Sequence, residues 1–102
     1  MPDSADPVTL IATFRAQQGQ GSTVMSLISA YGEVVRAEPG NIFFDVYTDR
    51  DDSHAFVIIE RYQNHDAFQQ HLGGAAGAEF NSHLGPLIEG DGSELQFLRM
   101  AP

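Results

Sequence analysis

Three residue types are missing from the sequence: cysteine, lysine and tryptophan. Without cysteine, the chain forms no disulfide bonds, thiolate metal sites or iron–sulfur clusters, and it has no cysteine nucleophile. Without lysine, it contains no phosphate-binding loop of the G-x-x-x-x-G-K type. The glycine-rich stretches "GQGS" (19–22) and "GGAAG" (73–77) are therefore not nucleotide-binding loops of that kind.

Basic residues are scarce as well. Five arginines stand against 14 acidic residues, which gives the 102-residue chain a formal net charge of −9. Binding to a nucleic-acid backbone requires a basic face that releases counterions, and an anionic membrane surface attracts basic segments for the same reason. We therefore expect neither a nucleic acid nor a membrane as a partner, and a small molecule or another protein stays open.

Long apolar runs are also absent, and no stretch approaches the length of a membrane span. The first residues, "MPDSADP", are acidic and lack the basic and apolar regions of a signal peptide. We expect a cytoplasmic protein in which residues 1–7 form a disordered tail. With 42% hydrophobic and 19% charged residues, residues 8–102 are expected to form one globular domain.

The first half of the chain predicts a strand, a helix and a second strand. Residues 8–16 alternate in the manner of a strand, and Ser22 or Thr23 is placed to cap a helix. That helix has apolar residues at helical spacing, namely Val24, Leu27, Ile28, Tyr31, Val34 and Val35. The "EPG" turn (38–40) ends the helix, and 41–48 reads as the next strand.

The second half predicts a strand at 54–62, after a charged hairpin loop at 49–53, and then a helix from about His65 with Asn64 as its cap. "GGAAG" (73–77) interrupts the helical pattern. A further helical stretch follows, which Pro86 is expected to kink or end, and 93–100 is the last strand.

The predicted order is β-α-β-β-α-β, with the second helical unit broken in two. This is the ferredoxin-like α+β arrangement, in which helices cover one face of an antiparallel sheet. The other face of the sheet is also predicted to be apolar, so a single copy would expose a large apolar patch. We expect a second copy to cover it, giving a homodimer with a barrel-like core.

Three stretches resemble a known family: "EPGNIFFDVY" (38–47), "FVIIERYQNHDAFQQHL" (56–72), and Phe80 followed by "PLI" (86–88). The resemblance is to the antibiotic-biosynthesis monooxygenase family of the dimeric α+β barrel superfamily, and it runs from about Val8 to about Met100. The matching positions are Glu38, Pro39, Gly40, Phe44, Tyr47, Glu60, Tyr62, Ala67, Phe68, His71, Leu72, Phe80, Pro86 and Leu87.

The chain departs from the family pattern at two places. Tyr62 stands where the family usually has tryptophan. Ala75 and Ala76 stand where members often carry a second histidine and a proline. A mechanism that needs this second histidine is therefore not supported, and the small residues could instead widen the mouth of a pocket or loosen a lid.

Three polar residues are the candidate catalytic groups. His71 lies on the inner face of a predicted helix, where it is either a structural histidine bonded to a carboxylate or carbonyl, or an acid–base group beside a cavity. Glu60 follows an apolar run and needs a partner, for which His71 is one candidate and the chain around the first helix another. Tyr62 shares a strand face with Glu60, and core packing and a role in a pocket are both open to it.

Four further residues are candidate substrate-binding groups. Asn41 follows the Pro-Gly turn, where it either stabilises the turn or presents its amide to a pocket. Aromatic side chains can line a site for planar rings, and the candidates are Phe44, Phe68 and Phe80. The remaining histidines have no metal-site spacing, and the "DRDD" run lacks the glycine and distal glutamate of a calcium loop, so no metal is expected.

The resemblance implies a cofactor-independent monooxygenase that acts with dioxygen on a small aromatic, such as a quinol or an anthrone-like polyketide. In that function His71 would be the acid–base group, Tyr62 an oxyanion donor, Glu60 the residue that orients a donor, and Asn41 a substrate-binding amide. Two alternatives stay open: isomerisation of a small hydroxy-carbonyl compound, and a non-catalytic ligand-binding dimer. Haem chemistry on this fold normally needs a first-strand asparagine and a tryptophan, which are missing here.

Overall fold

The computed structural model describes residues 5–102. Along the chain the elements are β1 (Val8–Arg15), α1 (Gly21–Arg36), β2 (Asn41–Asp49), β3 (Asp52–Tyr62), α2 (His65–Leu72), α3 (Ala75–Leu84), the 3-10 turn η1 (Gly85–Leu87) and β4 (Glu94–Leu98). The predicted ferredoxin-like α+β fold is confirmed, including the break between the second and third helices. None of the described helices has the length and apolar character that crossing a membrane requires.

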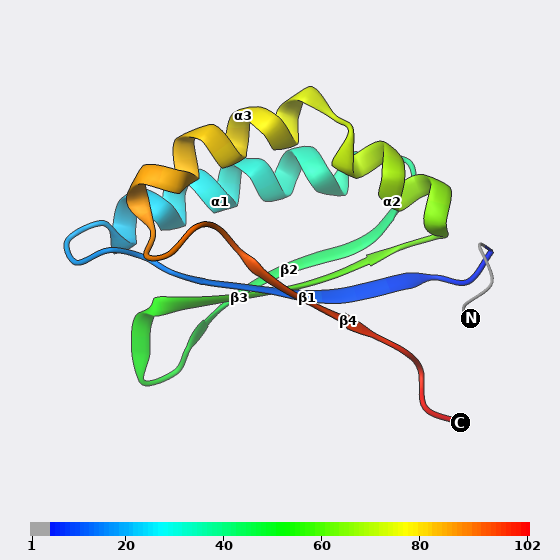
Figure 1. Cartoon of the computed structure of the whole chain (residues 1–102), viewed down its shortest axis with the longest axis horizontal. Helices are drawn as coiled ribbons and strands as arrows, with labels where there is room; N and C mark the ends of the chain where they lie inside the picture. The colour runs from blue at the N-terminus through cyan, green and yellow to red at the C-terminus, as the bar shows by residue number, and fades with distance from the viewer. Residues whose placement is uncertain (1–4) are drawn as a thin grey trace.

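The four strands form one antiparallel sheet in the order β2-β3-β1-β4. Glu60 on β3 lies opposite Leu10 on β1 and Phe44 on β2, so these three side chains point to the same face. All three helices lie over that face, and the opposite face carries no helix (Figure 1). The apolar core is therefore the layer between the sheet and the helices.

Helix α1 differs from the prediction at its start and on one flank. The helix begins at Gly21 after Gln20, whose side chain makes no cap bond, so the predicted cap at Ser22 or Thr23 is wrong. The preceding turn closes early, with Gln20 N donating to Gln17 O at 2.9 Å, and this leads the chain into the helix sooner. Val34 is 48% exposed because it lies about a quarter turn away from the buried stripe of the helix.

The hairpin between β2 and β3 is tighter than predicted. Asp49 pairs with Asp52, so Arg50 and Asp51 alone form the tip, and the Asp51 amide donates to Asp49 Oδ1 at 2.8 Å. Asp52 also pairs with Arg15, whose guanidinium reaches Glu89 at 3.1 Å. These contacts tie the base of the hairpin to the end of β1 and to the segment before β4.

The opposite face of the sheet is partly apolar, as predicted. Its apolar side chains are half-buried or exposed in the single chain and are Ile11, Phe43, Val57, Ile59, Tyr47 and Leu98. The predicted pairing of this face with a second copy stays a prediction. The predicted tail falls mainly on residues 1–4, which lie outside the described residues, and β1 begins at Val8, where we placed the start of the domain.

Candidate active site

A cavity of about 440 Å³ lies between the sheet and the helices. Leu10 and Ile58 line it from the sheet, and Tyr31, Phe80 and Leu84 line it from α1 and α3. The other apolar side chains in the lining are Ala12, Phe14, Ile28, Phe44, Phe68, Leu72, Ile88 and Leu95. A mostly apolar pocket of this size with a few polar groups is typical of a small-molecule site.

Glu60 and His71 bring polar groups to the lining of this cavity. Glu60 is only 6% exposed, and burial raises the pKa of its carboxyl group above the ordinary value. Glu38 adds to this rise through repulsion, while the hydrogen bond from Tyr62 and the nearby His71 oppose it. A carboxyl group that the protein keeps in an apolar layer therefore lies beside a histidine at the cavity wall.

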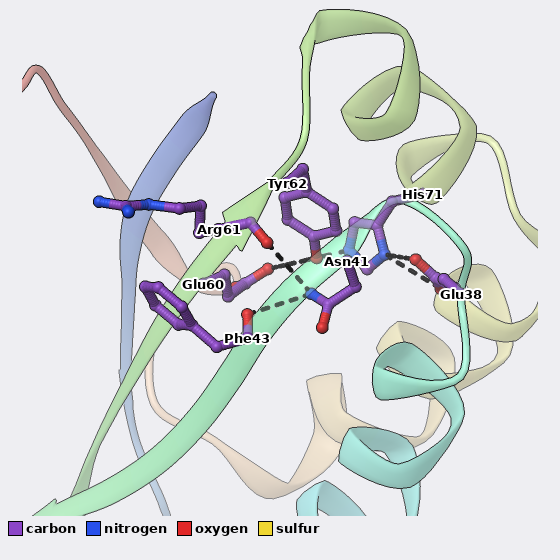
Figure 2. Close-up of polar contacts among 7 residues, drawn as sticks. All are labelled: Glu38, Asn41, Phe43, Glu60, Arg61, Tyr62 and His71. Carbon is purple, nitrogen blue, oxygen red and sulfur yellow. Dashed lines mark hydrogen bonds and ion pairs between the residues drawn. The ribbon is translucent and has the colours of Figure 1, made fainter. Parts of the chain in front are cut away.

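Tyr62 is the hydrogen-bond donor to this carboxyl group. Its hydroxyl donates a hydrogen bond to Glu60 Oε1 at 2.7 Å, and the side chain has no exposed area (Figure 2). Burial and the Glu60 charge raise the pKa of Tyr62, so its hydroxyl stays protonated and donates. Tyr62 is not among the residues that line the cavity, and it reaches the site through Glu60.

The His71 ring lies between two carboxylates (Figure 2). Nδ1 is 3.0 Å from Glu38 Oε1 and 3.3 Å from Oε2, whereas Nε2 is 3.9 Å from Glu60 Oε1. An ionised carboxylate only accepts hydrogen bonds, so the contact with Glu38 favours the tautomer that carries its proton on Nδ1. The separation of 3.9 Å is too long for a hydrogen bond, so Nε2 keeps a lone pair for another partner.

The "EPG" turn brings Glu38 to His71. A Cβ atom on Gly40 would lie 2.3 Å from the Cβ of Ala67, so only glycine allows the turn to pack this closely against α2. Ala67 and His71 are one helical turn apart and share a face of α2. The close approach at Ala67 therefore places the carboxylate of Glu38 beside the imidazole.

Helix α2 is fixed at its start by Asn64. The Asn64 side chain accepts a hydrogen bond from the Ala67 amide at 2.8 Å, which confirms the predicted cap. The neighbouring Gln63 amide donates to Gly40 O at 2.8 Å, so the same junction binds both the helix start and the turn. Together these bonds set the position of His71.

The candidate substrate-binding residues occupy two different places. Phe44, Phe68 and Phe80 all line the cavity. Asn41 is not among the lining residues, and its amide donates to Phe43 O at 3.1 Å and to Arg61 O at 3.4 Å. These bonds brace the register shift at the start of β2, so the geometry favours the turn-stabilising alternative for Asn41.

Sequence reasoning missed two residues of the site. The sequence places Glu38 in a family motif but does not identify it as the partner of His71. Tyr31 was placed on the buried stripe of α1, and the structure adds that its ring lies in the cavity wall. The helical spacing in the sequence could have identified Tyr31, since a tyrosine on an apolar helix face carries a hydroxyl into the interior.

Acidic and histidine side chains do not assemble a metal centre in the described part of the chain. Within residues 5–102, no group of three or more of them is arranged to hold a metal ion. His83 lies 3.9 Å from Glu79 on the exposed side of α3, away from the cavity. Glu38, Glu60 and His71 instead form a chain of neighbouring acid–base groups beside the cavity.

These features define a ferredoxin-like protein with a histidine between two carboxylates at the wall of an apolar cavity. A family model for antibiotic biosynthesis monooxygenase matches residues 7–82. The chain belongs to this family. It is also similar to the Mycobacterium tuberculosis protein named "Putative monooxygenase Rv0793", with 29% identity over 82 residues that cover 80% of each chain.

Solved structures agree with this assignment. The structure of Rv0793 from Mycobacterium tuberculosis has a TM-score of 0.86 and 26% identity, covering 95% of this chain and 97% of the other. PA3566 from Pseudomonas aeruginosa has a TM-score of 0.85 and 29% identity over 98% and 100% of the two chains. SnoaB from Streptomyces nogalater, a cofactor-independent oxygenase solved as a point mutant, has a TM-score of 0.83 and 22% identity over 96% of each chain, and this likeness concerns the fold.

Proposed function

We propose that the protein is a cofactor-independent monooxygenase that oxidises a small aromatic substrate, such as a quinol or an anthrone-like polyketide. The observation that carries the proposal is the position of His71 between Glu38 and the cavity. Its Nδ1 lies 3.0 Å from Glu38 Oε1, and with the ring proton on Nδ1 the Nε2 lone pair can act as a base at the cavity wall. Membership of the monooxygenase family supports the same reaction type.

The reaction begins with a proton transfer. Nε2 of His71 takes a proton from the substrate hydroxyl or activated CH group, and the substrate anion that results is electron-rich enough to pass an electron to dioxygen. The two radicals combine, one oxygen atom stays in the product, and the other leaves as water. All four electrons come from the substrate, as when a quinol and O2 give a hydroxyquinone and H2O, so no external reductant enters the balance.

The protein supports this chemistry with its electrostatics. The carboxylate of Glu38 stabilises the imidazolium that forms when Nε2 takes the proton. The apolar lining keeps water away from the substrate anion and from the reduced oxygen species, which strengthens each polar contact. In this scheme the hydrogen bond between Tyr62 and Glu60 fixes the position of the Glu60 carboxyl group beside Nε2.

We propose in addition that the bare face of the sheet pairs with a second copy of the chain. This face carries the half-buried side chains of Ile11, Val57 and Ile59, and the helices leave it uncovered (Figure 1). It also carries Asp45 on β2 and Arg61 on β3, charges of opposite sign that suit a self-complementary contact. A 102-residue chain gains from burying such a face because its own core is modest.

Oxygen uptake by the purified protein tests the proposed function. A panel of quinols and anthrones is offered without added cofactor to wild type, His71→Ala and the control His83→Ala, whose histidine is exposed. We expect uptake by wild type and the control, and a loss of roughly 100-fold or more in His71→Ala, the scale of general acid–base catalysis. Equal uptake by all three would contradict the proposal, and no uptake on any substrate would favour the isomerase or the binding dimer.

A further inference from the structure

Tyr31, whose side chain carries a hydroxyl group, is one of the residues that line the cavity. Among residues 5–102, the structure shows no hydrogen bond to this hydroxyl. The polar groups nearby are engaged differently, since Tyr62 donates to Glu60 and His71 binds Glu38. A bound molecule could therefore take the place of water as the hydrogen-bond partner of this hydroxyl.

The Tyr31 ring is held in one orientation. It stacks flat on Phe80, with ring centres 4.1 Å apart and planes 5° apart, and it meets Phe44 edge to face at 5.8 Å. A Cβ atom on Gly77 would lie 3.1 Å from the hydroxyl oxygen, so the glycine leaves room for it between α1 and α3. The hydroxyl is therefore fixed in position before any ligand arrives.

The electrostatic setting makes this hydroxyl a donor. Burial, followed by repulsion from the Glu38 and Glu60 carboxylates, raises the pKa of Tyr31 to about 12. The group therefore stays protonated at neutral pH. The ring centres of Tyr31 and His71 are 6.3 Å apart, and both residues line the cavity, so the two side chains lie close together in its wall.

We propose that Tyr31 is the substrate-contacting donor of this site, and that its hydroxyl binds the same substrate oxygen whose proton His71 removes. The inference rests on the proposed function in taking the ligand to be a hydroxylated aromatic. It moves the role of oxyanion donor from Tyr62 to Tyr31, because the Tyr62 hydroxyl is already committed to Glu60 and lies outside the cavity lining.

The same lining defines the charge of the substrate. Glu60 lies in the polar wall and Asp91 at the exposed rim, and no arginine is among the lining residues within 5–102. A carboxylate or phosphate on the ligand would meet these acidic groups and no arginine, which is unfavourable in an apolar cavity. The substrate class is therefore a neutral aromatic with a hydroxyl group and no acid group.

Binding of three small probes tests this inference without requiring turnover. Equilibrium dialysis measures the Kd of 2-naphthol, naphthalene and 2-naphthoic acid for wild type, Tyr31→Phe and the control Tyr47→Phe, which alters an exposed tyrosine on the bare sheet face. We expect Tyr31→Phe to weaken 2-naphthol binding by about 5-fold, the value of one ordinary hydrogen bond, and to leave naphthalene binding unchanged. Wild type should bind 2-naphthoic acid more weakly than 2-naphthol.

Four outcomes would overturn the inference. The first two are that wild type does not bind 2-naphthol and that Tyr31→Phe leaves the 2-naphthol Kd unchanged. The third is that Tyr31→Phe weakens naphthalene binding as much as 2-naphthol binding, which would mean a purely structural role, and the fourth is that wild type binds 2-naphthoic acid more tightly than 2-naphthol. A failure of the proposed oxygenase reaction can be distinguished from a failure of the role of Tyr31. If Tyr31→Phe weakens naphthol binding but wild type takes up no oxygen, Tyr31 remains a ligand donor and the oxygenase reaction is rejected. If oxygen uptake depends on His71 but Tyr31→Phe binds naphthol as wild type does, the reaction stands and the role of Tyr31 is rejected.

Discussion

Glu38 and His71 are 33 positions apart in the chain, yet the imidazole Nδ1 lies 3.0 Å from the Glu38 carboxylate. The pair is only partly accessible, with 10% of the His71 side chain and 30% of the Glu38 side chain exposed. It orients the ring so that Nε2 is available at the cavity wall. This contact connects the turn after α1 to the chemistry proposed for α2.

Glu38→Ala should change the tautomer equilibrium of the His71 ring. Without the carboxylate to hold the Nδ1 proton, the other tautomer, which can donate from Nε2 toward Glu60, gains population. Nitrogen-15 chemical shifts of the labelled imidazole measure the two populations, with Glu33→Ala on the exposed side of α1 as the control. Identical shifts in wild type and Glu38→Ala would show that Glu38 does not set the tautomer.

Gly40→Ala should lower the free energy of unfolding by about 1–3 kcal/mol, the usual cost of an inserted methyl group in a packed site. The new Cβ would lie 2.3 Å from the Cβ of Ala67, so the turn and α2 must move apart. Gly85→Ala is the matched control, because a Cβ there meets nothing within 4 Å. Urea denaturation of both variants checks the difference, and equal stabilities would mean that the close approach is not required.

Glu60→Gln should become more stable relative to wild type as the pH rises. The pKa of Glu60 is raised in the folded protein, so its favourable contribution is complete below the unfolded pKa and is lost as the pH rises through the folded pKa. Glutamine cannot ionise, and the gap should approach about 1.4 kcal/mol for each unit by which the pKa is raised.

Thermal unfolding from about pH 4 upward, which begins near the unfolded pKa of a glutamate, measures this gap for Glu60→Gln, with the exposed Glu79→Gln as the control. Groups that titrate in both proteins contribute equally to the pH dependence of both stabilities, so their contributions cancel in the difference from wild type. A gap that does not change with pH would show that Glu60 is not a buried carboxyl group of raised pKa.

Ile59→Asp should separate the proposed dimer into single chains. Ile59 lies on the bare face of β3, and a charge there would be buried without a partner between two sheets. Light scattering after gel filtration should give a molar mass of about twice 11.1 kDa for wild type and for the control Met25→Asp, which alters an exposed residue of α1. It should give about 11.1 kDa for Ile59→Asp. A single-chain mass for wild type would contradict the pairing.

Local rules in the sequence predicted much of the fold. Asn64 was predicted as a cap because a cap depends on a few adjacent residues, and it accepts the Ala67 amide as expected. Strand alternation placed Glu60 and Tyr62 on one face, where they now share a hydrogen bond. The cap at Ser22 or Thr23 failed because the preceding turn, which no local rule fixed, begins the helix earlier.

The site was harder to predict because its contacts join distant segments. The role of Glu38 depends on how closely Gly40 packs on Ala67, which is a property of the assembled fold. Asn41 could reach either a pocket or its own turn, and only the backbone path shows that its amide braces β2. The helical stripe predicts that Tyr31 faces the interior, but it does not show that its hydroxyl lacks a partner.

The proposed reaction places oxygen from O2 into an aromatic substrate with His71 as the base. The most direct test is mass spectrometry of the product formed under 18O2, using any substrate that supports uptake, with wild type and His71→Ala at equal concentration. We expect one 18O atom per product molecule from wild type and little product from His71→Ala. Product without label, or labelled product formed equally by both proteins, would contradict the proposed reaction.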